Sequence, residues 1–167
     1  MKLLTYPLFA ALLGLFALSM PAHAASPQAT FNDLDGNPRT VESFIEKDKW
    51  LTVMIWAHDC HVCNMEAENY AHFHEANKNK NITMLGLSID GQANRKKALG
   101  FIGEHDLPFP NLIGEPQDVM RYYMMLTGNQ FYGTPTILVY KPDGTLAAAQ
   151  AGGVPSEVIE KFVNDNS

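Results

Sequence analysis

Residues 50–63 read WLTVMIWAHDCHVC, and this stretch decides the fold of the chain. Trp50 to Ala57 is almost wholly apolar, which is typical of a strand in the middle of a sheet with both faces buried. Cys60 and Cys63 follow this strand directly, and residues 63–77 after them are rich in Glu, Ala, Met and His. The stretch therefore predicts a strand that leads through two cysteines into a helix.

The chain on both sides of this unit alternates between short apolar runs and helical patterns. On the N-terminal side, Asp35-Gly36-Asn37 is a turn signal between two short strands within residues 31–41, and Ser43 is expected to cap a short helix over residues 44–47. On the C-terminal side we expect strands at 82–89, 111–113, 136–140 and 145–150, and helices at 92–104, 117–126 and 155–163. Alternating βαβ units predict an α/β fold, with a central sheet that carries helices on both faces.

The first 24 residues differ from the rest of the chain. Lys2 is their only charged residue, an apolar run from Leu8 to Met20 follows, and Pro21 precedes the small-x-small pattern Ala22-His23-Ala24. These features predict a secretory signal peptide over residues 1–24 and one domain over residues 25–167. An uncleaved membrane anchor is the alternative, because no Asp, Glu, Lys or Arg occurs between Leu3 and Asn32.

The composition excludes several classes of protein. The chain has 167 residues, of which 46% are hydrophobic and 18% charged, so it is too apolar for a disordered protein. Only two residues are cysteine, which is too few for a disulfide-stapled miniprotein. The formal net charge of −6 gives no electrostatic basis for binding nucleic acid.

The pair Cys60-His61-Val62-Cys63 has three interpretations. A purely structural disulfide is disfavoured, because the loop that it closes is very short and the unfolded chain is restricted little. Metal binding is disfavoured because a closed zinc site needs four ligands, although the thiolates with a histidine could hold copper in a non-enzymatic chaperone. Thiol–disulfide exchange is favoured, since the pair lies between a buried strand and the start of a helix, where a thiolate is stabilised. There Cys60 would attack a disulfide and Cys63, one turn later, would resolve the mixed disulfide.

The pattern Trp56-Ala57-x-x-Cys60-x-x-Cys63, together with Gly133-Thr134-Pro135-Thr136 at the start of a late strand, resembles the thioredoxin fold. More narrowly, the chain is similar to the exported thiol–disulfide oxidoreductases of the TlpA/ResA/CcmG type. This resemblance covers residues 28–165 of the thioredoxin-like domain. It implies a central mixed sheet flanked by helices, an N-terminal β-hairpin and a βα insertion.

The resemblance also assigns roles to residues of this chain. It implies that Cys60 is the nucleophile, that Cys63 is the resolving thiol, and that Glu66 handles a proton beside Cys63. An exposed helix glutamate without that role is the alternative for Glu66. The peptide bond between Thr134 and Pro135 is expected to be cis, and Thr134, Pro135 and Trp56 are expected to form the substrate-binding part of the site.

Some positions depart from the pattern of the family. Met54 stands where thioredoxin has a buried aspartate, and Asp59 stands where the family has a tryptophan before the first cysteine. A carboxylate at residue 59 would raise the pKa of the Cys60 thiol, whereas a protonated His61 would lower it. Ala57 stands where thioredoxin-fold peroxidases have a threonine, so peroxidase activity is not favoured.

The sequence as a whole predicts an exported, periplasmic thiol–disulfide oxidoreductase without a cofactor, most simply a monomeric reductase of disulfides in exported proteins. Cytochrome c maturation and metal-site assembly are candidate settings, and a membrane thiol-transfer protein is the expected electron donor. A disulfide oxidant or isomerase and a copper-binding chaperone remain the alternatives. We expect Met120, Met124 and Met125 to pack in the core instead of binding copper.

Overall fold

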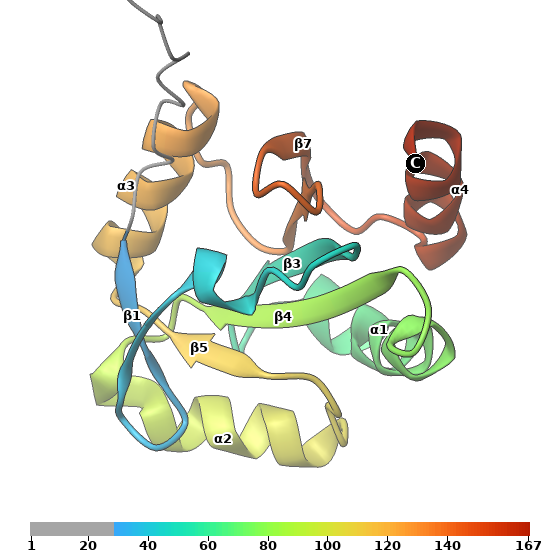
Figure 1. The fold of residues 1–167 in the computed structure, drawn as a ribbon. Coiled ribbons are helices and arrows are strands. Elements are labelled where there is room, and N and C mark those ends of the chain that lie inside the picture. The colour runs from blue at the N-terminus through green and yellow to red at the C-terminus, as the bar shows by residue number, and fades with distance from the viewer. Residues whose placement is uncertain (1–28) are drawn as a thin grey trace, which may run out of the picture.

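A seven-stranded mixed sheet with the order β2-β1-β5-β4-β3-β6-β7 forms the centre of the computed structural model (Figure 1), which describes residues 29–167. The predicted signal peptide lies outside the described residues. The strands are β1 Thr30–Asp33, β2 Pro38–Thr40, β3 Trp50–Trp56, β4 Ile82–Ser88, β5 Asn111–Ile113, β6 Thr136–Tyr140 and β7 Leu146–Ala151. The helices are α1 His61–Asn77, α2 Arg95–Glu104, α3 Pro116–Thr127 and α4 Ser156–Asn166, with short 3-10 turns η1 Val41–Phe44 and η2 Gln92–Asn94. The predicted α/β architecture, a thioredoxin fold with an N-terminal hairpin, is confirmed.

Strand β3 is the central strand that the apolar run predicts. All seven of its residues are buried, and it pairs in parallel with β4 and antiparallel with β6. Alternate residues of β3 belong to two separate cores, because successive side chains of a strand point to opposite faces of the sheet. Trp50, Met54 and Trp56 lie in one core, and Leu51, Val53 and Ile55 lie in the other.

Helices cover both faces of the sheet unequally. The core that contains Trp56 also receives side chains from α1, α2 and α4, among them Tyr70, Phe101 and Ile159. The opposite core is closed by α3, which contributes Val119 and Tyr122. Figure 1 shows α3 on the other side of the sheet from α1 and α2. Within residues 29–167, no helix combines the length and the apolar character needed to cross a membrane.

A hydrogen bond joins two buried side chains across strand β4. The indole Nε1 of Trp56 on β3 donates to Oδ1 of Asn111 on β5, at 3.1 Å. Gly86 of β4 lies between these two strands, and a Cβ atom at this residue would overlap Asn111 Oδ1 and lie 2.8 Å from Trp56 Nε1. Glycine at residue 86 is therefore what lets the indole and the amide meet.

Two expectations about local structure are wrong. The first helical turn after the hairpin runs over Val41–Phe44 instead of residues 44–47, because the Thr40 hydroxyl accepts a hydrogen bond from the Ser43 N–H at 3.2 Å and so caps an earlier turn. The methionines of α3 are not core residues throughout, since Met124 is 51% and Met125 62% exposed. Helix α3 buries Val119, Tyr122 and Tyr123 instead.

Replacement of Gly86 by alanine should destabilise the fold. The added methyl group would displace Asn111 or Trp56 and break the hydrogen bond between them, so we expect the free energy of unfolding to fall by about 2 kcal/mol or more. Urea unfolding measures this change. Gly100→Ala in α2 is the control: open space surrounds that position, and alanine favours the helix there, so stability should hold or rise. Equal losses in both variants would contradict the role given to Gly86.

His74 near the end of α1 makes stability depend on pH. Only 8% of its surface is exposed, its ring contacts Phe109 edge-on, and its Nδ1 has no hydrogen-bond partner among the described residues. Burial lowers the pKa of His74 below the ordinary value of 6.5, and Lys78 adds to this while Glu75 opposes it. In the unfolded chain the histidine recovers its ordinary pKa, so below about pH 6.5 the unfolded state binds more protons than the folded state.

The free energy of unfolding should therefore fall as the pH is lowered from about 8 to about 5, and His74→Gln should reduce that slope because glutamine does not titrate. Urea titrations at several pH values measure the slope. The matched control is His72→Gln, which removes an exposed histidine from the same helix and should leave the slope close to that of the wild type. If both variants kept the wild-type slope, His74 would not be a source of the acid sensitivity.

Candidate active site

Cys60 and Cys63 lie at the N-terminus of α1 and form a disulfide with an S–S distance of 2.09 Å. Cys60 is the N-cap of the helix, and its Sγ accepts a hydrogen bond from the Cys63 N–H at 3.1 Å. Cys60 is partly exposed, whereas Cys63 is completely buried. The unpaired N–H groups and the dipole at a helix N-terminus stabilise negative charge, so a thiolate at residue 60 is favoured there.

Asn64 stabilises the turn that carries Cys60 through side-chain hydrogen bonds. Its amide nitrogen donates to the carbonyl oxygens of Cys60 at 2.9 Å and His58 at 3.3 Å. Its Oδ1 lies 3.0 Å from Nε2 of His105, which follows α2. Because Oδ1 can only accept, Nε2 of His105 carries the proton. Sequence reasoning missed Asn64 and His105, since nothing in the local pattern links a helix residue to one 41 positions later.

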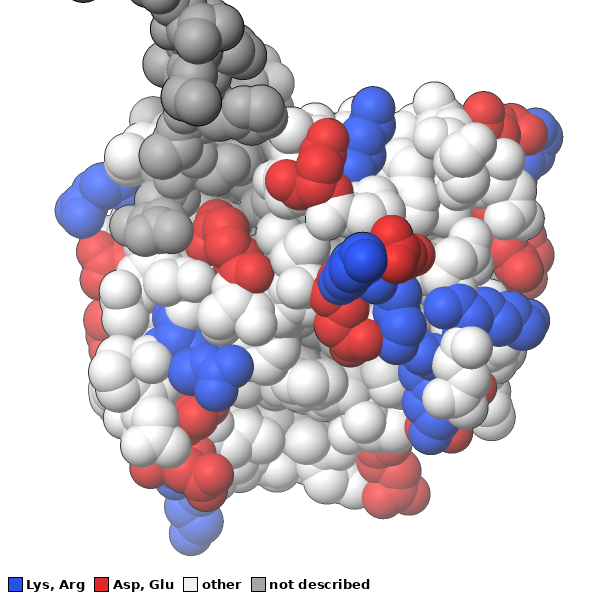
Figure 2. Space-filling view, viewed as in Figure 1, with Lys and Arg blue, Asp and Glu red and all other residues white. Residues whose placement is uncertain are grey.

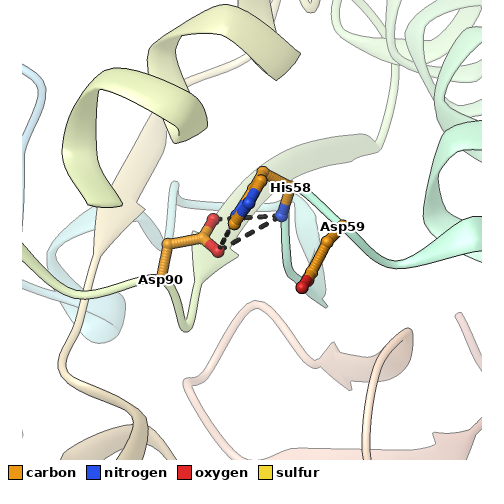
Figure 3. Close-up of side chains that lie close together, drawn as sticks. All are labelled: His58, Asp59 and Asp90. Carbon is orange, nitrogen blue, oxygen red and sulfur yellow. Dashed lines mark hydrogen bonds and ion pairs between the residues drawn. The ribbon is translucent and has the colours of Figure 1, made fainter. Parts of the chain in front are cut away.

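A buried carboxylate holds the other side of the same turn. Asp90 Oδ1 lies 2.6 Å from Nδ1 of His58, and the His58 backbone N–H donates to both carboxylate oxygens, at 3.1 and 3.3 Å. The Ser88 hydroxyl donates to Oδ2 at 2.6 Å. Figure 3 shows His58 and Asp90 directed toward each other, from the ends of neighbouring segments. This contact was also missed; the signal for it is that both residues stand two positions beyond the ends of adjacent parallel strands.

The peptide bond between Thr134 and Pro135 is cis, as expected. Strand β6 begins directly after it, and Thr136 pairs with Ile55 near the end of β3. Pro135 is buried and its carbonyl accepts from the Gly152 N–H at 2.8 Å, while Thr134 is partly exposed. The strand register thus brings Thr134 and Pro135 to the edge of the sheet where β3 leads to Cys60.

The structure places Trp56 away from the surface. Its side chain is completely buried, stacks on Phe101 with ring centroids 4.3 Å apart, and bonds to Asn111. A residue without exposed surface cannot contact a bound protein, so the expected part of Trp56 in substrate binding is not supported. Its position at the end of β3 makes it a support beneath the turn that carries Cys60.

Glu66 is half-buried on α1, one helical turn after Cys63. A Cβ atom at Gly153 would lie 3.5 Å from Cγ of Glu66, so the loop after β7 packs beside this side chain. Tyr70 holds that loop, because its hydroxyl donates to the Val154 carbonyl at 2.8 Å and accepts from the Val154 N–H at 3.2 Å. Burial raises the pKa of Tyr70 to about 12, so this hydroxyl stays neutral.

Three groups near the disulfide offer possible metal-ligand atoms within 4.8 Å of one another: His58, Asp59 and Asp90. The oxygens of Asp90 are already engaged by His58 and by Ser88, and Nδ1 of His58 is bonded to Asp90 itself. Asp59 is exposed and joins this network only by proximity. The contacts therefore describe a hydrogen-bonded pair, and we assign no metal ligand.

Residues 22–149 match the profile that describes the AhpC/TSA family. The chain belongs to the AhpC/TSA family. No sequence among the curated proteins is significantly similar to it. The family match runs from before β1 into β7, so the β-hairpin, the Cys60–Cys63 turn and the cis-proline of this AhpC/TSA-family protein all lie inside it.

Solved structures with the same fold carry related descriptions. The thioredoxin domain of a thiol–disulfide oxidoreductase from Bacteroides vulgatus has a TM-score of 0.68 and 26% identity, and the match covers 87% of this chain and 100% of that one. A thiol:disulfide interchange protein from Bacteroides sp. has a TM-score of 0.65 and 27% identity over 83% of this chain and 88% of that one. A secreted disulfide oxidoreductase of Mycobacterium tuberculosis, described as homologous to DsbE of E. coli, has a TM-score of 0.61 over 82% of this chain and 96% of that one, and at 22% identity it shows the fold alone.

The family, the fold and the cysteine pair together support a thiol–disulfide redox function for this AhpC/TSA-family protein. The pair has the chemistry that such a function requires: two cysteines within bonding distance, one partly exposed at a helix N-terminus and one buried behind it.

Proposed function

We propose that this protein is an exported thiol–disulfide oxidoreductase that reduces disulfides in other exported proteins, with Cys60 as its nucleophile. The observation that carries the proposal is the difference between the two sulfurs: Cys60 is partly exposed at the N-terminus of α1, and Cys63 is completely buried one turn later. The exposed sulfur is available to a partner protein, and the buried one is available only to Cys60.

The proposed reaction begins with the dithiol. The Cys60 thiolate attacks one sulfur of a substrate disulfide, so that a Cys60–substrate disulfide forms, the substrate S–S bond breaks, and the other substrate sulfur leaves as a thiolate that takes up a proton. Cys63 then loses its proton and attacks Cys60 Sγ, which restores the Cys60–Cys63 disulfide and releases the second substrate sulfur. Two electrons pass from the dithiol to the substrate, and a membrane thiol-transfer protein would return two electrons to the disulfide.

Substrate docking is proposed at the edge that the cis-proline forms. Thr134 is partly exposed beside the start of β6, and the neighbouring Tyr132 has 79% of its surface exposed. An extended segment of a partner could add to the backbone there, in the manner of strand addition. Val62 and Met65 on α1 are also exposed, at 40% and 62%, and would offer apolar contacts to the same segment.

The charge around the dithiol supports reduction as the direction of electron flow. No Lys or Arg occurs between Lys49 and Lys78, so β3 and α1 contain no permanently charged cation. The acidic residues Asp59 and Glu66 disfavour a thiolate in their neighbourhood, which opposes the helix N-terminus. A reduced form that is stabilised only weakly releases its electrons more readily.

We also propose that the chain acts in the periplasm as a monomer, with residues 1–24 removed on export. Acidic and basic side chains are interspersed over the face shown in Figure 2, and broad uncharged areas separate them. Such a surface suits contacts with varied exported proteins, among them candidates in cytochrome c maturation or metal-site assembly, better than binding to a polyanion.

The equilibrium redox potential of the protein without residues 1–24, measured against glutathione, tests the direction. We expect a value near that of thioredoxin, about −270 mV. A value near about −120 mV would instead identify an oxidant of the DsbA kind. Reduction of insulin by the wild type, and its loss in Cys60→Ser, would show that the dithiol itself transfers the electrons.

Glu66 is proposed to take the proton from Cys63 when the mixed disulfide is resolved. Its support is the one-turn spacing from Cys63 and its half-buried position. A neutral amide does not repel a thiolate, so Glu66→Gln should lower the pH at which Cys63 becomes reactive. Alkylation of the reduced protein followed by peptide mapping measures each thiol separately. Glu68→Gln, which alters an exposed residue of the same helix, is the control, and equal behaviour of the two variants would leave Glu66 a surface residue.

A further inference from the structure

The turn that carries Cys60 contains a hydrogen-bonded pair of side chains that the disulfide chemistry described above does not use. Strands β3 and β4 run in parallel with Trp56 opposite Ser88, and the chain leaves both strands at the same edge of the sheet. Two residues further along each segment stand His58 and Asp90, whose Nδ1 and Oδ1 atoms are 2.6 Å apart. The side chain of Asp90 is only 4% exposed, and that of His58 is 21% exposed.

The contacts of Asp90 fix the state of the histidine ring. Three donors converge on the carboxylate: the His58 ring, the His58 backbone N–H and the Ser88 hydroxyl. Since an ionised carboxylate only accepts, the His58 ring donates to it through Nδ1. A carboxylate in this position fixes the orientation of an imidazole.

We propose that His58 and Asp90 form a positioning pair that stabilises the Cys60 thiolate and so helps to set how readily the dithiol gives up its electrons. The pair acts in two ways. Asp90 holds the His58 backbone at the start of the turn, while the Cys60 N–H donates to the Ala57 carbonyl at 3.2 Å, so the turn keeps Cys60 at the helix N-terminus. In addition, a proton on His58 would place positive charge two residues before the nucleophile.

Several titratable groups surround the His58 ring. Asp59, in the same turn, has a carboxylate oxygen within 4.8 Å of the ligand atoms of both His58 and Asp90, so two carboxylates flank one imidazole. The other titratable groups around the turn are His61 and Glu66 on α1 and His105 after α2, which reaches the turn through Asn64. No Lys or Arg occurs between Lys49 and Lys78, so residues 50–77 could supply positive charge only through a histidine.

The inference rests on the proposed redox role of Cys60 and Cys63, but it does not depend on the direction of electron flow. No electron passes through the pair, so its effect is confined to the stability of the reduced form. Loss of the imidazolium should therefore weaken the thiolate and make reduction of the disulfide less favourable, whatever the potential of the wild type.

The test is a double-mutant cycle on the protein that remains after residues 1–24 are removed. His58→Gln retains an N–H donor for Asp90 but cannot become charged, so the pH midpoint of Cys60 alkylation should rise by about one unit. The equilibrium constant for reduction by glutathione should fall by about tenfold, which is about 30 mV toward more negative potentials. In the Asp90→Asn background the same His58→Gln substitution should have a much smaller effect, because the imidazolium has lost its carboxylate partner.

His61→Gln is the matched control, since His61 adjoins Cys60 but its ring makes no hydrogen bond with any residue that the structure describes. Its effect on both measurements should be the same in the wild-type and Asp90→Asn backgrounds. Ser88→Ala removes one hydrogen bond to Asp90 without removing a charge, so it shows the effect of a less firmly held carboxylate. Thermal unfolding of each variant shows whether a change comes from misfolding.

An unchanged alkylation midpoint and potential in a folded His58→Gln protein would overturn the inference. Equal effects of His58→Gln with and without the Asp90→Asn substitution would overturn it as well. These outcomes differ from a failure of the proposed function. That failure would appear as a wild-type potential close to that of an oxidant or as an inert dithiol, independently of any difference between the variants.

Discussion

Strand β3 lies between β4 and β6 with every side chain buried. Its pairing with both neighbours decides which ends of the three strands lie together. Because β3 and β4 are parallel and in register from Trp50 opposite Ile82 to Trp56 opposite Ser88, the chain leaves both strands at one edge of the sheet. Strand β6 is antiparallel to β3 and therefore begins at that edge. A cysteine turn, a carboxylate and a cis-proline from three separate segments come together for this reason, at the carboxyl ends of the parallel strands, where open α/β sheets place their sites.

Buried side chains beneath this edge of the sheet pack in one defined arrangement around Trp56. Trp56 is too large to lie beside another bulky side chain on the neighbouring strand, and Gly86 on β4 leaves the space in which its indole bonds to Asn111. Phe101 of α2 stacks on the same indole, and His105 extends the contact from the end of that helix to Asn64 on α1. The turn that carries Cys60 is thereby connected to the core on one side and to α2 on the other.

The electrostatics of the dithiol are a balance between opposing groups. The N-terminus of α1 favours a thiolate at residue 60, whereas the carboxylates of Asp59 and Glu66 disfavour one. Complete burial of Cys63 disfavours charge on the second sulfur and separates the behaviour of the two thiols. A change in any of these groups would therefore move the redox equilibrium of the protein, because the groups oppose one another.

The sequence alone determined most of the architecture. Apolar runs such as residues 50–57 and 82–89 predict the buried strands, since a strand covered on both faces must be apolar at every position, and the spacing of Cys60 and Cys63 predicts their chemistry. Local signals were less reliable at the first helical turn, where the Thr40 hydroxyl competes with Ser43 as the cap, and in α3, where adjacent methionines face solvent. Only the tertiary structure decided that His58, Asp90, Asn64 and His105 surround the cysteine turn. These contacts join segments that are 32 and 41 residues apart, and strand register and helix packing, which no local pattern encodes, bring such segments together.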